Sequence, residues 1–371
     1  MFRELISHLE WKILLVVIIL AVSGIATIYS SSYMPELAGI KLFPSADNYW
    51  EKQLIWFGFG LALAFCLALL DYHVVVKLAY IIYGLVVLMV IMVFIFGAVR
   101  SGSRRWLEIG GFSLQPSEAV KLALAIVLTR YFSDIKKNEA LSFRDILMPG
   151  ILTGIPFLFI LLQPDLGTAI SVLAIFFAYL LLVGLKKRVF VSGLFALAAS
   201  AVVMWFFLQD YQKKRILMLL GSESDARGSG YNIIQSKIAV GSGGIWGKGY
   251  LHGSQGQLRF LPESHTDFIF SVFAEEWGFV GVAAVILLFS SLIFLFLKTS
   301  CESRDKSAAL LSFGVAAMLT FQIIVNVSMI IGLMPIVGIP LPFFSYGGSS
   351  MITTMGAVGL ILSIRAHRYM R

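Results

Sequence analysis

The stretch Trp11-Lys-Ile-Leu-Leu-Val-Val-Ile-Ile-Leu-Ala-Val-Ser-Gly-Ile-Ala-Thr-Ile28 decides the fold of this chain. It is an almost uninterrupted apolar run, close to the roughly 20 residues that a helix needs to cross a bilayer. No small-residue cleavage site lies in the usual place after it. We therefore expect the run to stay in the protein as a membrane span and not to be removed as a signal peptide.

The composition also indicates a membrane protein. Of the 371 residues, 58% are hydrophobic and 13% are charged, whereas a soluble domain carries about 25% charged residues. The net charge of +8 does not indicate nucleic-acid binding, because most basic residues border apolar runs, where they orient the chain and meet anionic lipid. Cys66 and Cys301 form neither a disulfide framework nor a metal-ligand pattern.

The apolar runs predict an all-α polytopic membrane protein with about ten spans of about 20 residues each. All of them belong to a single predicted domain over residues 1–371. The predicted spans are residues 11–30, 50–70, 74–97, 117–133, 147–163, 167–185, 189–208, 268–297, 307–333 and 346–364.

The Lys and Arg residues of the short loops predict the orientation, because cytoplasmic loops carry the excess of positive charge. With the N-terminus inside, the predicted cytoplasmic set is Arg3, Lys12, Lys77, Arg130, Lys136, Lys137, Arg144, Lys186, Lys187, Arg188, Lys298, Arg304, Lys306, Arg365, Arg368 and Arg371. The short outer loops hold only Lys41, Lys52, Arg100, Arg104 and Arg105. Both termini are therefore expected in the cytoplasm, with residues 209–266 outside as a long loop between the seventh and eighth spans.

The long outer loop has two patterns of its own. The apolar residues of Tyr231–Val240 recur at helical spacing and predict a short helix lying at the membrane interface. The glycine-rich run Gly241–Gly249 lacks the GxxxxGK[ST] pattern of a P-loop and lies on the outer side, away from nucleotide.

A first candidate site surrounds the start of the predicted fourth span. Glu118 and Lys121 are spaced i, i+3, so they share a helix face and can pair. One interpretation is a plain structural ion pair. The other is a cationic cradle for a lipid diphosphate made by Arg104, Arg105 and Lys121, because Arg suits bidentate contacts with phosphate. Arginines on the face that should lack them favour the cradle.

Two other polar segments allow more than one interpretation. Asp165, in a tight outer turn, can cap the following helix or contribute to the site. Gln322 and Asn326 are spaced i, i+4 and can simply join helices by hydrogen bonds. The turn from Ser345 to Ser349 is expected to expose backbone N–H groups that line a cavity.

The sharpest candidate is Asp267, in Leu261-Pro-Glu-Ser-His-Thr-Asp-Phe-Ile-Phe270, where the long outer loop enters a span. A helix over residues 268–297 would be about 45 Å long, against about 30 Å of hydrocarbon, so its first turns should project outside the membrane. Thr266 or Asp267 can be an N-cap. Alternatively, Asp267 is a general base for an attacking sugar hydroxyl. Nearby residues that could tune this base or bind a divalent cation are Glu263, His265, Glu275 and Glu276.

In this order, these clusters closely resemble the SEDS family (shape, elongation, division and sporulation proteins) over nearly the whole chain. The segments that carry the resemblance are Gly102–Trp106, Gln115–Glu118 with Lys121, Gln163–Gly167, Pro262–Phe270 and Leu341–Ser349. The short N-terminus, the near-absent C-terminal tail and Gly253–Leu258 resemble the elongation-type branch of the family more than its division-type branch.

The resemblance implies a peptidoglycan glycosyltransferase in the bacterial cytoplasmic membrane, which polymerises lipid II with inversion for cell elongation and rod shape. It assigns the family's catalytic Asp to Asp267, and the functional Glu and Lys to Glu118 and Lys121. It also implies a class B penicillin-binding protein, a transpeptidase, as partner, together with other elongation-complex proteins. The expected substrate contacts are Arg104, Arg105, Glu118, Lys121, Asp165, His265, Ser345 and Ser349.

Two functions of other classes fit part of the pattern. A transporter that flips the lipid precursor would use the intramembrane charges and a broken helix at Ser345–Ser349, although no internal repeat is evident. A scaffold that only recruits a transpeptidase would need no base at Asp267. No nucleotide is expected, because the diphosphate bond of the precursor supplies the energy; no other cofactor is assigned, and a divalent cation stays open.

Overall fold

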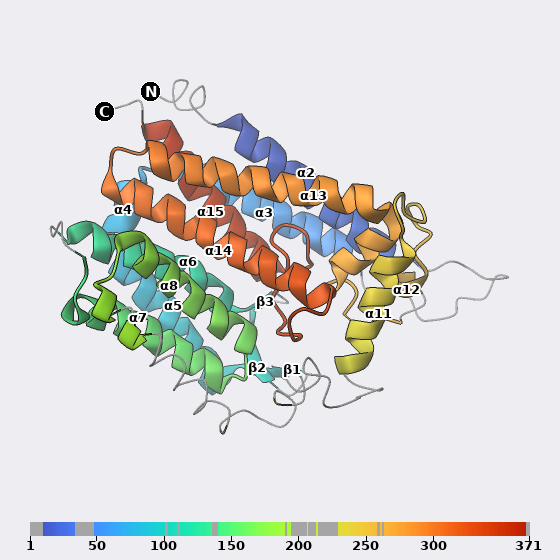
Figure 1. The fold of residues 1–371 in the computed structure, drawn as a ribbon, viewed down its shortest axis with the longest axis horizontal. Coiled ribbons are helices and arrows are strands. Elements are labelled where there is room, and N and C mark those ends of the chain that lie inside the picture. The colour runs from blue at the N-terminus through green and yellow to red at the C-terminus, as the bar shows by residue number, and fades with distance from the viewer. Residues whose placement is uncertain are drawn as a thin grey trace.

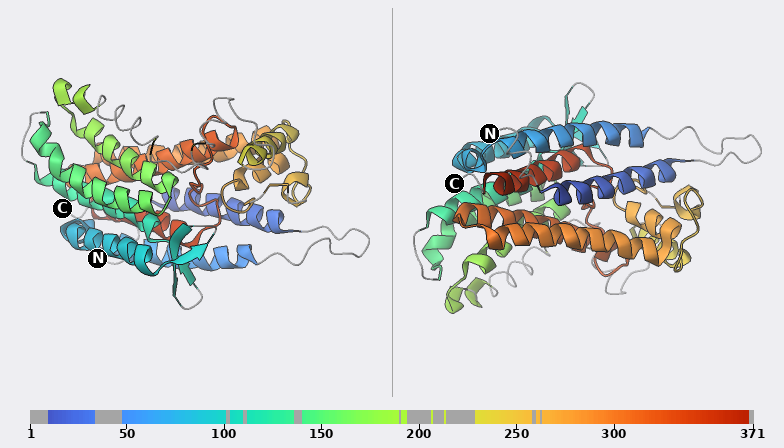
Figure 2. Two further views of the ribbon diagram at one scale, coloured as in Figure 1. Left: turned by 90° about the horizontal axis from the view of Figure 1, so that it is seen from below. Right: turned by 90° about the horizontal axis from the view of Figure 1, so that it is seen from above.

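The structure is a computed structural model that describes residues 10–33, 48–100, 103–109, 112–135, 140–189, 191–193, 206, 213, 229–257, 260–261 and 263–368. Long helices run side by side along the molecule, with a small sheet at one end of the bundle (Figures 1 and 2). The helices are α2 (Trp11–Ser32), α3 (Tyr49–Leu69), α4 (Tyr72–Lys77), α5 (Ala79–Phe96), α6 (Pro116–Asp134), α7 (Phe143–Leu162), α8 (Leu166–Val183), α11 (Ser229–Ser242), α12 (Ser254–Gln257), α13 (Ile269–Glu302), α14 (Lys306–Ile330) and α15 (Gly348–His367).

Among the described residues, 8 helices are long and apolar enough to cross a membrane, namely α2, α3, α5, α7, α8, α13, α14 and α15. The prediction of a polytopic all-α membrane protein is therefore confirmed. The predicted helix in the long outer loop is α11. The predicted span over residues 189–208 lies mostly outside the described residues, so a count of ten spans stays a prediction, as does the single-domain boundary.

Helix α6 matches the predicted fourth span but is less apolar than the others, because it carries charged residues. It packs against α5, α8 and α14, and its Glu118 and Lys121 side chains are buried. Protein rather than lipid surrounds this part of the helix. Ionisable groups are tolerated at membrane depth when protein surrounds them in this way.

The two ends of the described chain lie on the same side of the bundle. Arg365 Nε, near the end of α15, is 3.0 Å from Glu10 Oε2, just before α2. Arg365 Nη1 and Arg368 Nη1 lie 2.7 and 2.6 Å from Glu302 Oε2 at the end of α13. The common side agrees with the predicted arrangement of the termini, and the Lys and Arg residues around it predict that it faces the cytoplasm.

A small antiparallel sheet lies at the opposite end, in the outer loop between α5 and α6. Its strands are β1 (Ala98–Arg100), β2 (Ser103–Ile109) and β3 (Phe112–Leu114), in the order β1-β2-β3. No strand is expected here from the sequence pattern. Two of the three strands have only 3 residues, too few for an alternating pattern to stand out, and they form because they pair with β2.

Helix α13 is broken at Gly278, whose backbone has φ 63° and ψ −164°. The glycine-rich turn Gly243–Gly249 supplies hydrogen-bond partners for the backbone at the break. The N–H groups of the two residues after Gly278 donate to the carbonyls of Gly244 and Ile245 at 2.9 and 3.1 Å. In return, two N–H groups of the turn donate to α13 carbonyls, both at 3.0 Å. The break separates residues 269–277 from the longer part of α13 that follows. The sequence predicts a long helix here but no break in it.

We predict that Gly278→Ala destabilises the protein by about 1–3 kcal/mol, because this backbone conformation is almost exclusive to glycine. An added Cβ would also lie 2.3 Å from the backbone nitrogen of Gly247. The control is Gly58→Ala in α3, where an added Cβ has no neighbour within 4 Å and alanine favours the helix. Thermal unfolding in detergent measures both variants. A Gly278→Ala protein as stable as Gly58→Ala would contradict this account of the break.

Candidate active site

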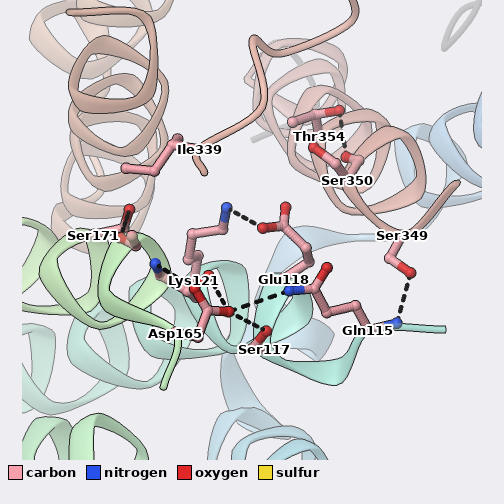
Figure 3. A network of polar contacts seen from close by, with 12 residues as sticks. Gln115, Ser117, Glu118, Lys121, Asp165, Ser171, Ile339, Ser349, Ser350 and Thr354 are labelled. Carbon is pink, nitrogen blue, oxygen red and sulfur yellow. Dashed lines mark hydrogen bonds and ion pairs between the residues drawn. The ribbon is translucent and has the colours of Figure 1, made fainter. Parts of the chain in front are cut away.

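Polar groups gather at the outer end of the bundle, where several helices begin or end around non-helical backbone. The turn Glu263–Phe268 precedes α13, the turn Gln163–Asp165 separates α7 from α8, and residues 331–347 connect α14 to α15. Figure 3 shows the part of this region around Glu118, Lys121 and Asp165.

Asp267 lies in the turn before α13 and is partly exposed. The N-cap of α13 is Phe268, which makes no side-chain cap hydrogen bond, so the N-cap interpretation of Thr266 or Asp267 is wrong. The side-chain amide of Asn326 donates to the Asp267 carbonyl at 3.2 Å and to the Ile339 carbonyl at 2.9 Å. One side chain of α14 therefore holds the backbone that carries Asp267.

His265 helps to anchor the same turn. Its ring stacks on Tyr49 at the start of α3, with ring centroids 4.2 Å apart and planes 11° apart. Its carbonyl accepts a hydrogen bond from Tyr346 N at 3.0 Å. Tyr346 also meets the Tyr49 ring edge-on at 5.0 Å. In the described structure His265 therefore joins the turn before α13 to α3 and to the turn before α15.

The turn containing Ser345 is held by internal hydrogen bonds. Ser345 Oγ accepts from Leu341 N at 2.9 Å, and the Ser345 carbonyl accepts from Gln53 Nε2 at 3.1 Å. The N–H groups of residues 345, 346 and 347 have acceptors in Leu341, His265 and Gln53 respectively. The expectation of exposed N–H groups is therefore wrong for these residues, because Gln53 of α3 and the neighbouring turns take them up.

Glu118 and Lys121 form the expected ion pair, with Lys121 Nζ 2.8 Å from Glu118 Oε1 and side chains only 5% and 1% exposed. The second oxygen of the carboxylate, Glu118 Oε2, is buried and has no hydrogen-bond partner among the described residues. The same holds for Gln322 Oε1 and Asn326 Oδ1 on α14, which packs against α6. Buried acceptors of this kind need a donor, which water or the hydroxyl and amide groups of a ligand can supply.

Asp165 caps α8 and also connects α8 to the start of α6. It caps α8 by accepting from Thr168 N at 3.3 Å, and it also accepts from Thr168 Oγ1 at 3.0 Å. From α6 and the residue before it, Ser117 Oγ and Gln115 Nε2 donate to Asp165 Oδ2 at 3.4 and 3.2 Å (Figure 3). The capping interpretation is confirmed, and the remaining contacts join the starts of α6 and α8.

Of the two predicted cradle arginines, Arg105 is described in full. Its Nε and Nη2 donate to the carbonyls of Gln163 and Pro164, its Nη1 lies 3.9 Å from Asp165 Oδ1, and its side chain stays 26% exposed. Arg104 pairs with Val99 in the sheet, but its side chain lies outside the described part of the chain.

Ser349 connects α15 to the start of α6. Its Oγ accepts from Gln115 N at 2.8 Å (Figure 3). The predicted contact residues Ser345 and Ser349 therefore both make hydrogen bonds inside the protein. They shape the outer end of the bundle.

Residues 331–347 lie next to both Asp267 and the start of α8. A Cβ placed on Gly338 would lie 3.6 Å from Asp267 Oδ2, and a Cβ placed on Gly167 would lie 2.9 Å from Ile339 Cγ1. Gly167 follows Asp165 by two residues, and the Ile339 side chain lies above Ser171 of α8 in the view of Figure 3. The connection between α14 and α15 thus passes close to both Asp267 and the residues that follow Asp165.

Glu275 and Glu276 are engaged with the outer loop. Glu275 Oε1 accepts from Lys248 Nζ at 2.6 Å and from Ser254 N at 2.9 Å. Glu276 accepts from the backbone of Leu251 and Gly253 in the loop, and its Oε1 also accepts from Ser30 Oγ at the end of α2. No group of three or more His, Cys, Asp or Glu residues that could hold a metal ion occurs in the described ranges. The divalent cation left open by the sequence thus finds no ligand cluster there, and both glutamates anchor the loop instead.

Sequence reasoning missed Gln53, Ser30 and the double contact of Asn326. Gln53 and Ser30 are polar residues at the ends of apolar spans, a signal that can be read from the sequence. Their partners, Gly347 and Glu276, lie far away in the chain and could not be identified from it.

Membrane-crossing helices that enclose buried charges and amides beneath non-helical backbone define a polytopic membrane protein with a polar site at one face of the bilayer. The particular family follows from comparison with known proteins. The chain belongs to the FTSW_RODA_SPOVE family of cell cycle proteins, whose family model matches residues 10–370.

Relatives match along almost their whole length. The chain is 37% identical over 369 residues to the peptidoglycan glycosyltransferase MrdB of Escherichia coli K12, covering 98% of this chain and 95% of that protein. It resembles a chain of a peptidoglycan synthase complex that coordinates polymerization and crosslinking (TM-score 0.81, 32% identity, 98% and 99% covered). It also resembles the crystal structure of the rod shape determining protein RodA of Thermus thermophilus (TM-score 0.71, 30% identity, 97% and 98% covered).

We predict that Lys121→Met destabilises the protein by about 3–5 kcal/mol, because it leaves the buried Glu118 carboxylate without its cation. The double variant Glu118→Gln with Lys121→Met should recover most of the loss, since no unpaired charge remains. Thermal unfolding in detergent measures both. A double variant as unstable as the single one would show that packing of the lysine chain, and not its charge, matters for stability.

Proposed function

We propose that this protein is an elongation-type peptidoglycan glycosyltransferase. It polymerises lipid II into β-1,4 glycan strands at the outer face of the bacterial cytoplasmic membrane. The family, the peptidoglycan glycosyltransferase MrdB among its relatives and the likeness to RodA support this function. The single observation that carries it is Asp267: a partly exposed carboxylate at the outer end of the bundle, not used as a helix cap.

The reaction forms one glycosidic bond and breaks one bond to diphosphate. The 4-hydroxyl oxygen of the acceptor sugar attacks C1 of the donor sugar, and the bond from C1 to the diphosphate oxygen breaks with inversion. Asp267 accepts the proton of the attacking hydroxyl, and undecaprenyl diphosphate leaves with the bonding electron pair. An aspartate is suited to this step because it is normally ionised at neutral pH.

Two cations are placed to offset the charge that develops on the leaving group. Arg105 is partly exposed and lies at the mouth of the site, while Lys121 lies deeper and pairs with Glu118. We assign Arg105, with Arg104, to the first contact with the diphosphate. Lys121 lies behind it, and the electrostatic field of its ammonium group reaches the diphosphate while its ion pair with Glu118 offsets both buried charges.

The remaining acceptors suit a sugar. The buried oxygens of Glu118, Gln322 and Asn326 without partners among the described residues are acceptors for hydroxyl or amide donors. Asp165, Ser345 and Ser349 act by holding the backbone around the site. His265 acts in the same way, through Tyr49 and Tyr346.

A similar protein also indicates a protein partner for this chain. One similar chain belongs to a complex that coordinates polymerization and crosslinking. We therefore propose a class B penicillin-binding protein, a transpeptidase, as the partner of this chain, together with other elongation-complex proteins.

We predict that Asp267→Asn lowers the polymerisation rate of the purified protein on lipid II by about 10²–10⁴-fold, the usual contribution of a general base. The control is Glu51→Gln, which changes an exposed carboxylate at the outer start of α3. Gel separation of the glycan products measures both. Asp267→Asn with the activity of Glu51→Gln would remove Asp267 from its role as the base.

Polymerisation by the wild-type protein in detergent separates the enzyme from a lipid flippase. An enzyme makes glycan strands in micelles, where there is no membrane to cross, whereas a transporter makes none. We expect strands from the purified chain, with a higher rate when the transpeptidase partner is added. If lipid II stays intact in both mixtures, the transporter becomes the better assignment.

A further inference from the structure

An apolar groove runs along the outside of the bundle between α2 and α3. It has a volume of about 590 Å³. Seen from above, α15 lies between these two helices (Figure 2, right), and its Leu362 lines the bottom of the groove. The lining residues are Trp11, Leu14, Leu15, Ile18, Leu61, Ala62, Phe65 and Leu362.

The groove is confined to one leaflet. Trp11–Ile18 forms the first two turns of α2, next to the end of the bundle that carries the Glu10–Arg365 pair. The excess of Lys and Arg places that end on the cytoplasmic side. The groove therefore opens to the lipid of the cytoplasmic leaflet, on the side opposite to the proposed active site.

The length of the groove suits an acyl chain better than a helix. Trp11–Ile18 spans about 12 Å at 1.5 Å per residue, whereas a partner helix would contact its neighbour across much of about 30 Å of hydrocarbon. The side chains that line the groove are all apolar, so they offer nothing to a polar ligand. A single hydrocarbon chain matches both properties.

The charge at the mouth of the groove favours an anionic headgroup. Lys12 is exposed and makes no ion pair or hydrogen bond with the described residues. The neighbouring Glu10 is neutralised by Arg365, 3.0 Å away. Among the described residues beside the groove, Lys12 is thus a charge without a partner, at the depth where lysine and tryptophan meet lipid headgroups.

We propose that this groove binds the acyl chain of an anionic glycerophospholipid of the cytoplasmic leaflet, with the phosphate beside Lys12 and Trp11. The site is separate from the proposed glycosyltransferase site and does not depend on that function. The bound lipid covers the lipid-facing side of α2 within that leaflet. Helix α2 packs against α13 and carries Ser30, the partner of Glu276.

Fluorescence quenching by brominated lipid tests the proposal, because Trp11 lines the groove. The full-length protein is placed in vesicles of dibrominated phosphatidylglycerol or dibrominated phosphatidylcholine, and the Trp11 signal is the difference from a matched Trp11→Phe protein. We expect Trp11 to select phosphatidylglycerol about fivefold, the effect of one lysine near an anionic headgroup. Lys12→Gln should abolish the selection while leaving quenching by both lipids.

A second quenching experiment fills the groove with a larger side chain. Ala62→Phe should lower quenching of Trp11 by both lipids. The matched control is Gly84→Phe on α5, where an added Cβ meets nothing within 4 Å, and which should leave the Trp11 signal unchanged. If Ala62→Phe does not fold, Leu15→Phe, at an exposed lining position, takes its place.

Three results would overturn the proposal. Equal quenching of wild-type Trp11 by the two lipids means that no headgroup is selected. Unchanged quenching after the groove is filled means that the lipid lies elsewhere. A Trp11 that neither lipid quenches means that protein, and not lipid, covers the groove.

Discussion

Backbone that is not helical survives near the membrane only where the protein itself supplies hydrogen-bond partners, and the outer end of this molecule depends on that constraint. The amide of Asn326 donates to carbonyls in two different non-helical segments, at Asp267 and at Ile339. Gln53 supports the turn before α15 in both roles: its Nε2 donates to the Ser345 carbonyl, and its Oε1 accepts from Gly347 N. The site can be irregular because buried amides on regular helices hold it, and the position of Asp267 follows from that support.

The same constraint explains how charges enter the bundle. Glu118 and Lys121 are almost fully buried but neutralise each other, and Asp165 is surrounded by donors from α6, the residue before α6, and α8. A buried charge with partners of this kind is tolerated, whereas an isolated one is expensive. Stability and chemistry are therefore difficult to separate here: the residues best suited to bind a diphosphate or a sugar are also those that close the end of the bundle.

The two ends of the molecule have different chemistry. At the side predicted to face the cytoplasm, the buried Arg365 and the half-buried Arg368 form ion pairs with Glu302 and Glu10 that fasten the ends of α2, α13 and α15. At the outer side, a broken α13 and a glycine-rich turn exchange backbone hydrogen bonds around Gly278. Ion pairs between side chains hold the first end together. The second end carries the partly exposed carboxylate of Asp267 beside the connection between α14 and α15.

Properties that depend on neighbours in the chain could be predicted from the sequence. These are most of the apolar spans, the i, i+3 pairing of Glu118 with Lys121 and the cap at Asp165, because hydropathy and helical spacing are local. The tertiary structure alone decided which remote groups met: Gln53 with the turn of Ser345, Ser30 with Glu276, and the glycine-rich turn with the break at Gly278. It also showed that three N–H groups expected to be exposed are paired, and that a sheet precedes α6. A hydrogen bond between residues hundreds of positions apart leaves no periodic pattern in the chain, so only the folded molecule reveals it.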